Sequence, residues 1–398
     1  MNTPLPKALI PPLPLPTAAN TGLWFDKFCN TWPDNKWELK SDSDKSVDNP
    51  KLAWIKTVTA AKRGIAALLT EHATRAARLA EKLGGTHRVY TTTYRFASGL
   101  GRDHPIENGL TWHPTLGIPF LPGSSVKGML RAYVENQEVV TSTKKNQILN
   151  RIFGPSANPS TKSSVGSVIF FDALPAAPVQ LKADVMTPHY DDYYQDETGK
   201  TIPGDWHSPI PIPFLTVAPD QSFQFAIAPR TQTDEDKADC EKVLNWLSDA
   251  LQTTGAGAKT AIGYGRFKRD EETETRLEKE RADIMAKEEY QTKLISLSPI
   301  ARELATAAHD GNWESDKNNF NQQFFFNEAW LLKIEKSPEP DILSEIKRLV
   351  EKHYPGLLAN PDKTQGKKKG FAFKENPRKS AKRLNALLKA PPDPNTLS

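Results

Sequence analysis

Residues 117–131 read GIPFLPGSSVKGMLR, and they determine how the centre of the chain is interpreted. A Pro-Gly turn is followed by Val126 and Leu130, which begin an apolar helical pattern that continues to about residue 136. Ser124 or Ser125 can cap this helix, because a serine hydroxyl accepts a hydrogen bond from the first free backbone N–H groups. The positive end of the helix is therefore expected to present N–H groups to an anion.

The same stretch does not fit a nucleotide-hydrolysing P-loop, which requires GxxxxGK[ST]. Gly128 follows Lys127 instead of preceding it, and Met129 stands where a metal-binding hydroxyl is needed. The stretch GAGAKT at 255–260 also fails, because an alanine replaces its final glycine. The stretch still fits phosphate binding without hydrolysis, because Lys127 and Arg131 lie one helical turn apart and place two positive charges on the same helix face. The alternative is a tight helix cap beside a solvated lysine.

The segments on either side of the motif predict an α+β fold. Residues 87–98 alternate β-branched and aromatic residues and are expected to form a strand, after a helical run at 50–83. Downstream we expect helices at 144–154 and 234–253, strands at 167–174, 179–186 and 260–268, and a strand pair at 211–219 and 221–229 around Pro219 and Asp220. Short strands mixed with two helices favour a ferredoxin-like, split βαβ sandwich.

Composition changes along the chain suggest three parts. Residues 1–85 form a Pro-rich arm and an N-terminal helical extension, and residues 86–270 form the ferredoxin-like core. Residues 271–398 form a charged helical C-terminal extension, with helices expected near 298–309, 314–335, 339–353 and 377–389. A basic segment at 367–383 is either a solvated linker or a second nucleic-acid contact.

Bulk properties exclude several classes of protein. The 398 residues carry a formal net charge of only +4, so any nucleic-acid contact depends on local clusters of charge. Cys29 and Cys240 make neither a disulfide framework nor a CxxC zinc site, and we expect two reduced thiols in a cytoplasmic protein. No stretch approaches ~18 apolar residues, so no membrane contact is expected. No HxH, HExxH or paired-carboxylate pattern indicates a metal or other cofactor.

A second glycine cluster, GAGAKTAIGYGRF at 255–267, strengthens the binding interpretation. Its glycines allow a ligand to approach the main chain closely. Lys259 and Arg266 supply positive charge, and Tyr264 supplies an aromatic face. Backbone amides, cations and an aromatic ring together are typical of single-stranded RNA recognition. The alternative is a glycine turn that only connects a helix to a strand.

Taken together, these motifs resemble the RAMP superfamily of CRISPR-associated proteins. The resemblance rests on GIPFLPGSSVKGMLR, on the upstream loop GLGRDHPIENG at 99–109, and on the glycine loop at 255–267. The segment DVMTPHYDDYY, followed by DWHSPIPIPFLTV, makes the resemblance more specific. Within the superfamily, the chain resembles the sixth-subunit group of the Cmr, or type III-B, effector complex. The match covers roughly residues 87–268 and leaves both ends of the chain outside.

The resemblance implies a RRM-like core and a non-catalytic RNA-binding subunit. Its expected partners are the 3′ region of the CRISPR RNA, the target RNA paired with that guide, and other RAMP subunits of the Cmr complex. Asp103 lies in a loop comparable to the one that carries a catalytic aspartate in a different subunit, and no catalysis is transferred to it. The residues expected to contact RNA are Arg102, His104, Ser124, Ser125, Lys127, Arg131, Gly255, Gly257, Lys259, Gly263, Tyr264 and Arg266.

Two other functions fit parts of the sequence. A metal-independent endoribonuclease that processes CRISPR RNA would use His104 or His189 as general base, with Lys127 or Tyr190 stabilising the transition state. An assembly cap would instead rely on the aromatic N-terminal segment and the C-terminal helices, and its RNA-binding loops would be inactive. Charge reversal at Lys127 and Arg131 distinguishes this cap from an RNA-binding subunit.

Overall fold

The computed structural model describes residues 15–31, 49–136, 142–155, 164–204, 206–207, 209–362 and 375–389. Two compact units divide the chain, residues 1–279 and 280–398. The predicted Pro-rich arm lies outside the described residues up to position 14, and so do residues 367–374 of the basic segment.

The first unit is an α+β fold built on an antiparallel sheet. The sheet has the order β2-β6-β1-β7, and β3 also pairs with β6. Its strands are β1 Thr86–Thr92, β2 Val168–Phe170, β3 Leu174–Pro175, β6 Ser222–Pro229 and β7 Phe267–Arg269. Helices α4 Gly123–Asn136 and α5 Ser142–Phe153 connect β1 to β2, and α7 Asp234–Thr253 connects β6 to β7. Every neighbouring pair of strands runs antiparallel.

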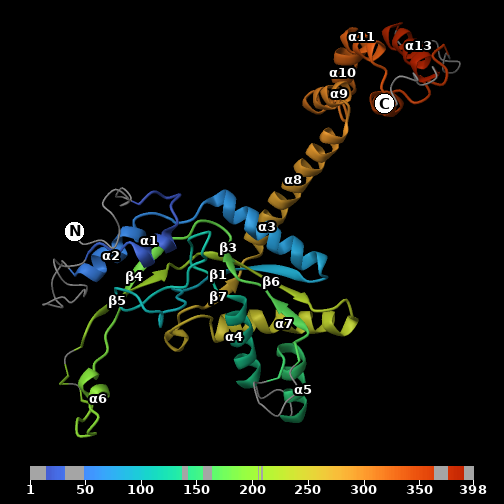
Figure 1. Cartoon of the computed structure of the whole chain (residues 1–398). Helices are drawn as coiled ribbons and strands as arrows, with labels where there is room; N and C mark the ends of the chain where they lie inside the picture. The colour runs from blue at the N-terminus through green and yellow to red at the C-terminus, as the bar shows by residue number, and fades with distance from the viewer. Residues whose placement is uncertain are drawn as a thin grey trace. The chain divides into compact units, whose positions relative to one another are not determined.

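Helices cover both faces of this sheet, so the central strand β6 is buried on both sides. Phe225 packs edge-to-face on Tyr90 of β1, whose hydroxyl meets Ser248 of α7 at 2.8 Å. The neighbouring Gln224 points to the opposite face, where its amide donates to Ala73 O of α3 Ala66–Lys82 at 2.8 Å. Figure 1 shows α3 on one side of the sheet and α4 and α7 on the other.

The prediction of one helical run over 50–83 is wrong in one respect, because the run is broken. Helix α2 spans Pro50–Thr59, and α3 begins at Ala66. Between them the Arg63 main chain pairs with Val179, and Gly64 has a φ of +107°, which a helix does not allow. The buried Arg63 guanidinium donates to the carbonyl oxygens of Leu15, Thr57 and Val58. This contact holds the N-terminal segment on the first unit.

The described part of the N-terminal segment shares a core with the sheet. Helix α1 Thr21–Lys27 buries Trp24 and Phe25, which pack on Trp54 of α2. These side chains belong to the same buried cluster as the sheet residues.

The predicted strands at 211–219 and 221–229 are present, but they do not pair with each other. β5 Ile212–Val217 pairs instead with β4 Leu181–Met186 in a separate two-stranded sheet. The turn between β5 and β6 includes Asp220 with a φ of +60°, and this turn leads the chain from one sheet to the other. The β4–β5 ribbon continues into an arm, residues 187–211, that includes α6 Asp191–Gln195 and extends away from the sheets of the first unit (Figure 1).

Helix α8 Glu271–Ser296 leads into the C-terminal unit, which is helical and has its own aromatic core. Its remaining elements are α9 Pro299–Asp310, α10 Lys317–Phe320, the π-helical turn η3 Asn321–Phe325, α11 Ala329–Lys336, α12 Pro340–His353 and α13 Glu375–Lys389. The helix predicted at 314–335 is therefore interrupted. Trp313, Phe320 and Phe324 are buried and pack on one another.

Candidate functional site

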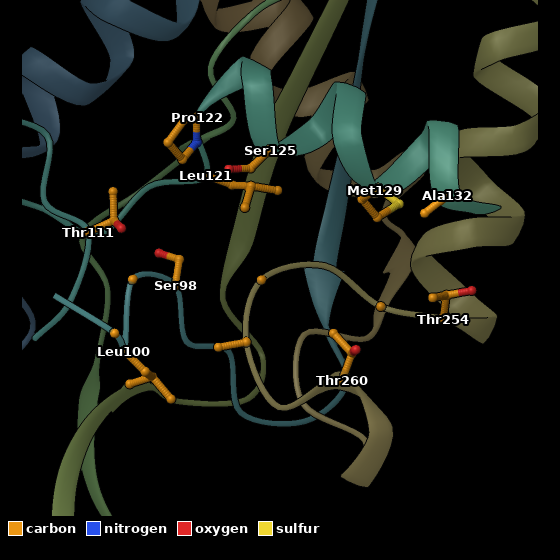
Figure 2. Close-up of a pocket in the computed structure, with 15 residues that line it drawn as sticks. Ser98, Leu100, Thr111, Leu121, Pro122, Ser125, Met129, Ala132, Thr254 and Thr260 are labelled. Atoms are coloured by element: carbon orange, nitrogen blue, oxygen red, sulfur yellow. The ribbon is translucent and has the colours of Figure 1, made fainter. Parts of the chain in front are cut away.

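A cleft of about 590 Å³ lies where the three motifs of the sequence meet. The loop after β1 contributes 98–101, and α4 contributes Ser125, Met129 and Ala132, with Pro122 just before it. The end of α7 and the second glycine loop contribute Thr254, Gly255, Gly257, Ala258 and Thr260. Figure 2 shows Ser125 and Met129 on α4 facing the loops that carry Ser98, Leu100 and Thr260. The tertiary structure thus brings together segments that are far apart in the sequence.

The glycine loop is fixed by main-chain hydrogen bonds to the loop after β1. Ala258 N donates to Ala97 O and Gly265 N donates to Arg95 O, both at 2.8 Å. A β-carbon on Gly257 would lie 2.2 Å from Ala97 O, and one on Gly265 would lie 1.8 Å from Ala256 O. Both glycines also have positive φ values, so this wall of the cleft requires glycine for internal reasons.

None of the predicted cations on the two loops, Arg102, Lys259 and Arg266, lines this cleft. Arg102 and Arg266 are exposed, and Arg102 follows the turn closed by its N–H to Gly99 O at 3.1 Å. Lys259 has a left-handed φ of +59°, and its ammonium lies 5.5 Å from the centre of the Phe214 ring. Gly263 follows with a φ of +97°, and the position that a β-carbon would occupy there is open. These side chains can place positive charge beside the glycine loop.

Helix α4 separates the predicted residues into two faces. Ser125, Met129 and Ala132 line the cleft, and Lys127 and Arg131 project from the other side of the helix at the angle set by the helical repeat. The Arg131 guanidinium donates to Glu135 at 2.9 Å and to Gly154 O at 3.0 Å. Of the residues on α4 that were predicted to contact RNA, Ser125 lines the cleft, and Lys127 and Arg131 do not.

The start of α4 also differs from the prediction. The helix begins at Gly123, whose N–H donates to the Asp172 carboxylate at 2.7 Å, and Ser125 N donates to Pro122 O. The expected cap by Ser124 or Ser125 is replaced by Asp172, whose negative charge lies where an anion was expected. Both serines remain exposed.

His104 does not face the cleft. Its side chain is 2% exposed and stacks on Phe25, with ring centroids 4.4 Å apart. Nε2 lies 2.9 Å from Phe25 O, and Ile106 N donates to Nδ1 at 3.2 Å. Burial lowers the pKa of His104 to about 4, so it is neutral at physiological pH. It holds α1 against the loop and is not positioned to contact RNA or to act as a surface base.

Tyr264 is also buried, where stacking on a base was considered. Its hydroxyl donates to the Asp184 carboxylate on β4, and Asp184 also pairs with Arg95 at 2.5 Å. Burial, followed by the hydrogen bond to Asp184, raises the pKa of Tyr264. This contact ties the second glycine loop to the base of the β4–β5 arm.

The arm carries exposed aromatic side chains that the sequence analysis did not select. Tyr194 is 76% exposed and Trp206 is 75% exposed. Trp206 lies beside His207, with ring centroids 5.9 Å apart, and Asp196 orders the tip by accepting from the N–H groups of Thr198 and Thr201. The sequence feature that could have indicated these exposed aromatic residues was a tryptophan, Trp206, inside a polar insertion.

The described ranges contain no group of three or more histidine, cysteine or acidic residues arranged to hold a metal ion. In the same ranges, no helix combines the length and apolar character needed to cross a membrane.

The family model of the RAMP superfamily matches residues 75–268. The CRISPR system Cmr subunit Cmr6 of Pyrococcus furiosus is 31% identical over 242 aligned positions, covering 47% of this chain and 69% of that protein. The CRISPR system CMR subunit Cmr6 of Saccharolobus solfataricus is 28% identical over 163 positions, covering 40% of this chain and 48% of that protein.

Two solved structures are also similar in part. A cryo-EM structure of the type III-B Cmr-beta bound to cognate target RNA contains a chain with a TM-score of 0.43 and 21% identity, covering 60% of this chain and 82% of that one. The crystal structure of Cmr6 from Pyrococcus furiosus gives a TM-score of 0.29 at 27% identity, covering 47% of this chain and 98% of that one. The sequence match to the Pyrococcus furiosus protein confirms the resemblance seen in the motifs, and this chain belongs to the Cmr6 family of the RAMP superfamily.

Proposed function

We propose that this chain is a non-catalytic RNA-binding subunit of a type III-B CRISPR (Cmr) ribonucleoprotein, and that it binds the 3′ region of the CRISPR RNA and the guide–target duplex. The observation that carries the proposal is the convergence of three glycine-containing segments on one cleft. Its partners would be CRISPR RNA, target RNA and other RAMP subunits of the Cmr complex.

The cleft suits the backbone of a nucleic acid better than a small substrate. Its walls are main chain and small or uncharged side chains. Arg102 and Lys259 do not line it but are adjacent in the chain to the lining residues Gly101, Ala258 and Thr260. Contacts of this kind bind phosphates and sugars without reading bases. A guide-loaded complex needs this behaviour, because base pairing selects the target and the protein holds the backbone.

The sheet supports the same proposal. The chain order strand, helix, two strand positions, helix, strand, with the spatial order β2-β6-β1-β7, fits a ferredoxin-like, RRM-like core. In RRM-type modules the sheet itself stacks the bases of single-stranded RNA. Here α3 and α7 cover the two faces of the sheet, so the proposal places the RNA at the loops around the cleft.

The test is purification of tagged chain from its native host, followed by sequencing of bound RNA and identification of accompanying proteins. We expect CRISPR-derived RNAs together with other RAMP subunits. Recovery of the chain alone, or with unrelated RNA, would contradict the proposal.

The endoribonuclease alternative is weakened by the position of His104, which is buried between α1 and the loop after β1. His189 remains exposed on the arm, beside Tyr190 with ring centroids 6.2 Å apart. Incubation of the chain with precursor CRISPR RNA, in parallel with a His189→Ala variant, tests this alternative. Cleavage that the substitution abolishes would establish the ribonuclease and overturn the non-catalytic assignment.

A further inference from the structure

Gly101 and Gly128 are glycines whose presence the fold itself does not require. The other glycines in the described ranges have either a positive φ or a neighbour that a β-carbon would crowd. Gly101 and Gly128 have neither feature. Apart from chain neighbours and the backbone of α4, no heavy atom of the described residues lies within 4 Å of the position that a β-carbon would occupy. Both residues are exposed.

Gly101 lines the cleft, and Gly128 lies next to the cleft-lining residues of α4, although the two glycines come from different segments. Gly101 lines the cleft from the loop after β1. Gly128 lies on α4 three residues after Ser125 and four before Ala132, and both of these line the cleft. Residues at these spacings share a helix face, so Gly128 borders the cleft directly.

Gly128 also borders the second face of α4. It is adjacent to Lys127 in the chain and lies three residues before Arg131, the two cations that the cleft itself leaves out. A ligand that leaves the cleft over Gly128 therefore reaches positive charge within one helical turn. The exposed Ser124, four residues earlier, keeps this path small and polar.

A glycine inside an exposed helix destabilises that helix relative to alanine, because it loses more backbone freedom on folding. Gly128 has no positive φ and no crowding neighbour among the described residues, so nothing in the fold requires glycine at this position. A glycine in such a position is typical of a place where another molecule's backbone approaches the main chain closely. The second such glycine, Gly101, lines the cleft that Gly128 borders, which makes a purely local explanation for Gly128 insufficient.

Resting on the proposed RNA-binding function, we propose that the sugar-phosphate backbone of the RNA lies directly against the main chain at Gly101 and Gly128. It crosses α4 at Gly128 and passes from the cleft to the side of the helix that carries Lys127 and Arg131. A side chain at position 128 would separate the RNA from the helix and weaken its phosphate contacts. Gly128 is thus a positioning residue for the RNA.

The test compares stability and RNA affinity in the full chain carrying Gly128→Ala. We expect the melting temperature to rise by about 2–4 °C, because alanine favours the helix. We expect the affinity for a fluorescently labelled single-stranded oligoribonucleotide of mixed sequence to fall by about tenfold. A merely structural role would move stability and binding in the same direction. Gly128→Leu, which keeps helix propensity and adds bulk, should weaken binding further.

Asn136→Ala, at the far end of α4, is the matched control, and it should leave RNA affinity unchanged. If Gly128→Ala raises stability and RNA affinity equals that of the wild type, the inference is overturned and the proposed function stands. If the wild-type chain itself fails to bind the oligoribonucleotide, both are overturned. A loss of affinity in Asn136→Ala equal to that in Gly128→Ala would also refute a specific contact at position 128.

Discussion

The carboxylate of Asp172 accepts a hydrogen bond from the backbone N–H of Gly123 at 2.7 Å. This contact caps the helix that follows the Pro-Gly turn, and it places a negative charge at the positive end of the helix macrodipole. Phosphate is therefore expected to bind along the side of α4, next to its cleft-lining residues, and not at its first turn.

Substitution of Asp172 should reveal this cap. Asp172→Ala is expected to lower the free energy of unfolding by about 1 kcal/mol, because the first N–H of α4 loses its partner. Chemical denaturation monitored by circular dichroism measures this change. Asp172→Asn, which keeps an acceptor oxygen, is the control and should lose less. Equal stability of wild type and Asp172→Ala would show that the cap is unimportant.

Acid should destabilise the N-terminal docking through His104. Burial lowers the pKa of His104 from 6.5 to about 4, so the unfolded chain binds the proton more readily than the folded chain. Stability is therefore present above pH 6.5 and is lost progressively as pH falls toward 4. Between pH 7.5 and pH 5 the titration of His104 should lower the free energy of unfolding by about 2 kcal/mol.

Denaturation of the wild type and of His104→Gln across this pH range measures the effect. The variant should be less stable at neutral pH and should show a shallower decrease on acidification. The same slope in both proteins would assign the acid sensitivity to other groups.

Removal of the Tyr264 hydroxyl should loosen the base of the arm. Tyr264→Phe loses the hydrogen bond to the partly buried Asp184 carboxylate, which keeps its contacts with Arg95 and with the N–H of Val185. We expect a loss of about 1–2 kcal/mol and faster amide hydrogen exchange in β4 and β5. Tyr94→Phe, on the ring packed edge-to-face against Tyr264, is the matched control. Unchanged exchange in both strands would refute the coupling.

Lys259 should contribute to RNA binding through charge. Lys259→Ala is expected to weaken binding of a single-stranded RNA and to reduce the salt dependence of the affinity by about one phosphate contact. Lys379→Ala in the C-terminal unit removes the same charge from an ion pair with Glu375 and serves as control. An unchanged salt slope in Lys259→Ala would place the phosphate backbone elsewhere.

The sequence by itself determined the main helices of the first unit, since periodicity and turn residues are local properties. The strands were predicted less well: the strand expected at 260–268 is a 3-10 turn, Thr260–Ile262, followed by β7, and the strand expected at 87–98 ends at Thr92. The helix predicted at 234–253 spans Asp234–Thr253, and the helix after the Pro-Gly turn ends at Asn136, as expected. The motifs also identified the family, because they are contiguous in the chain. The break at Gly64 was visible as a glycine, but the pairing of Arg63 with Val179 that fixes it was not.

Only the tertiary structure decided which of these local signals face one another. It brought the loop after β1, α4 and the second glycine loop to a single cleft, and it turned Lys127 and Arg131 to the other side of the helix. It also buried His104 against Phe25 and Tyr264 against Asp184, although both lie in loops rich in glycine and charge. The physical reason is that burial depends on packing partners distant in sequence, and no local pattern encodes these partners.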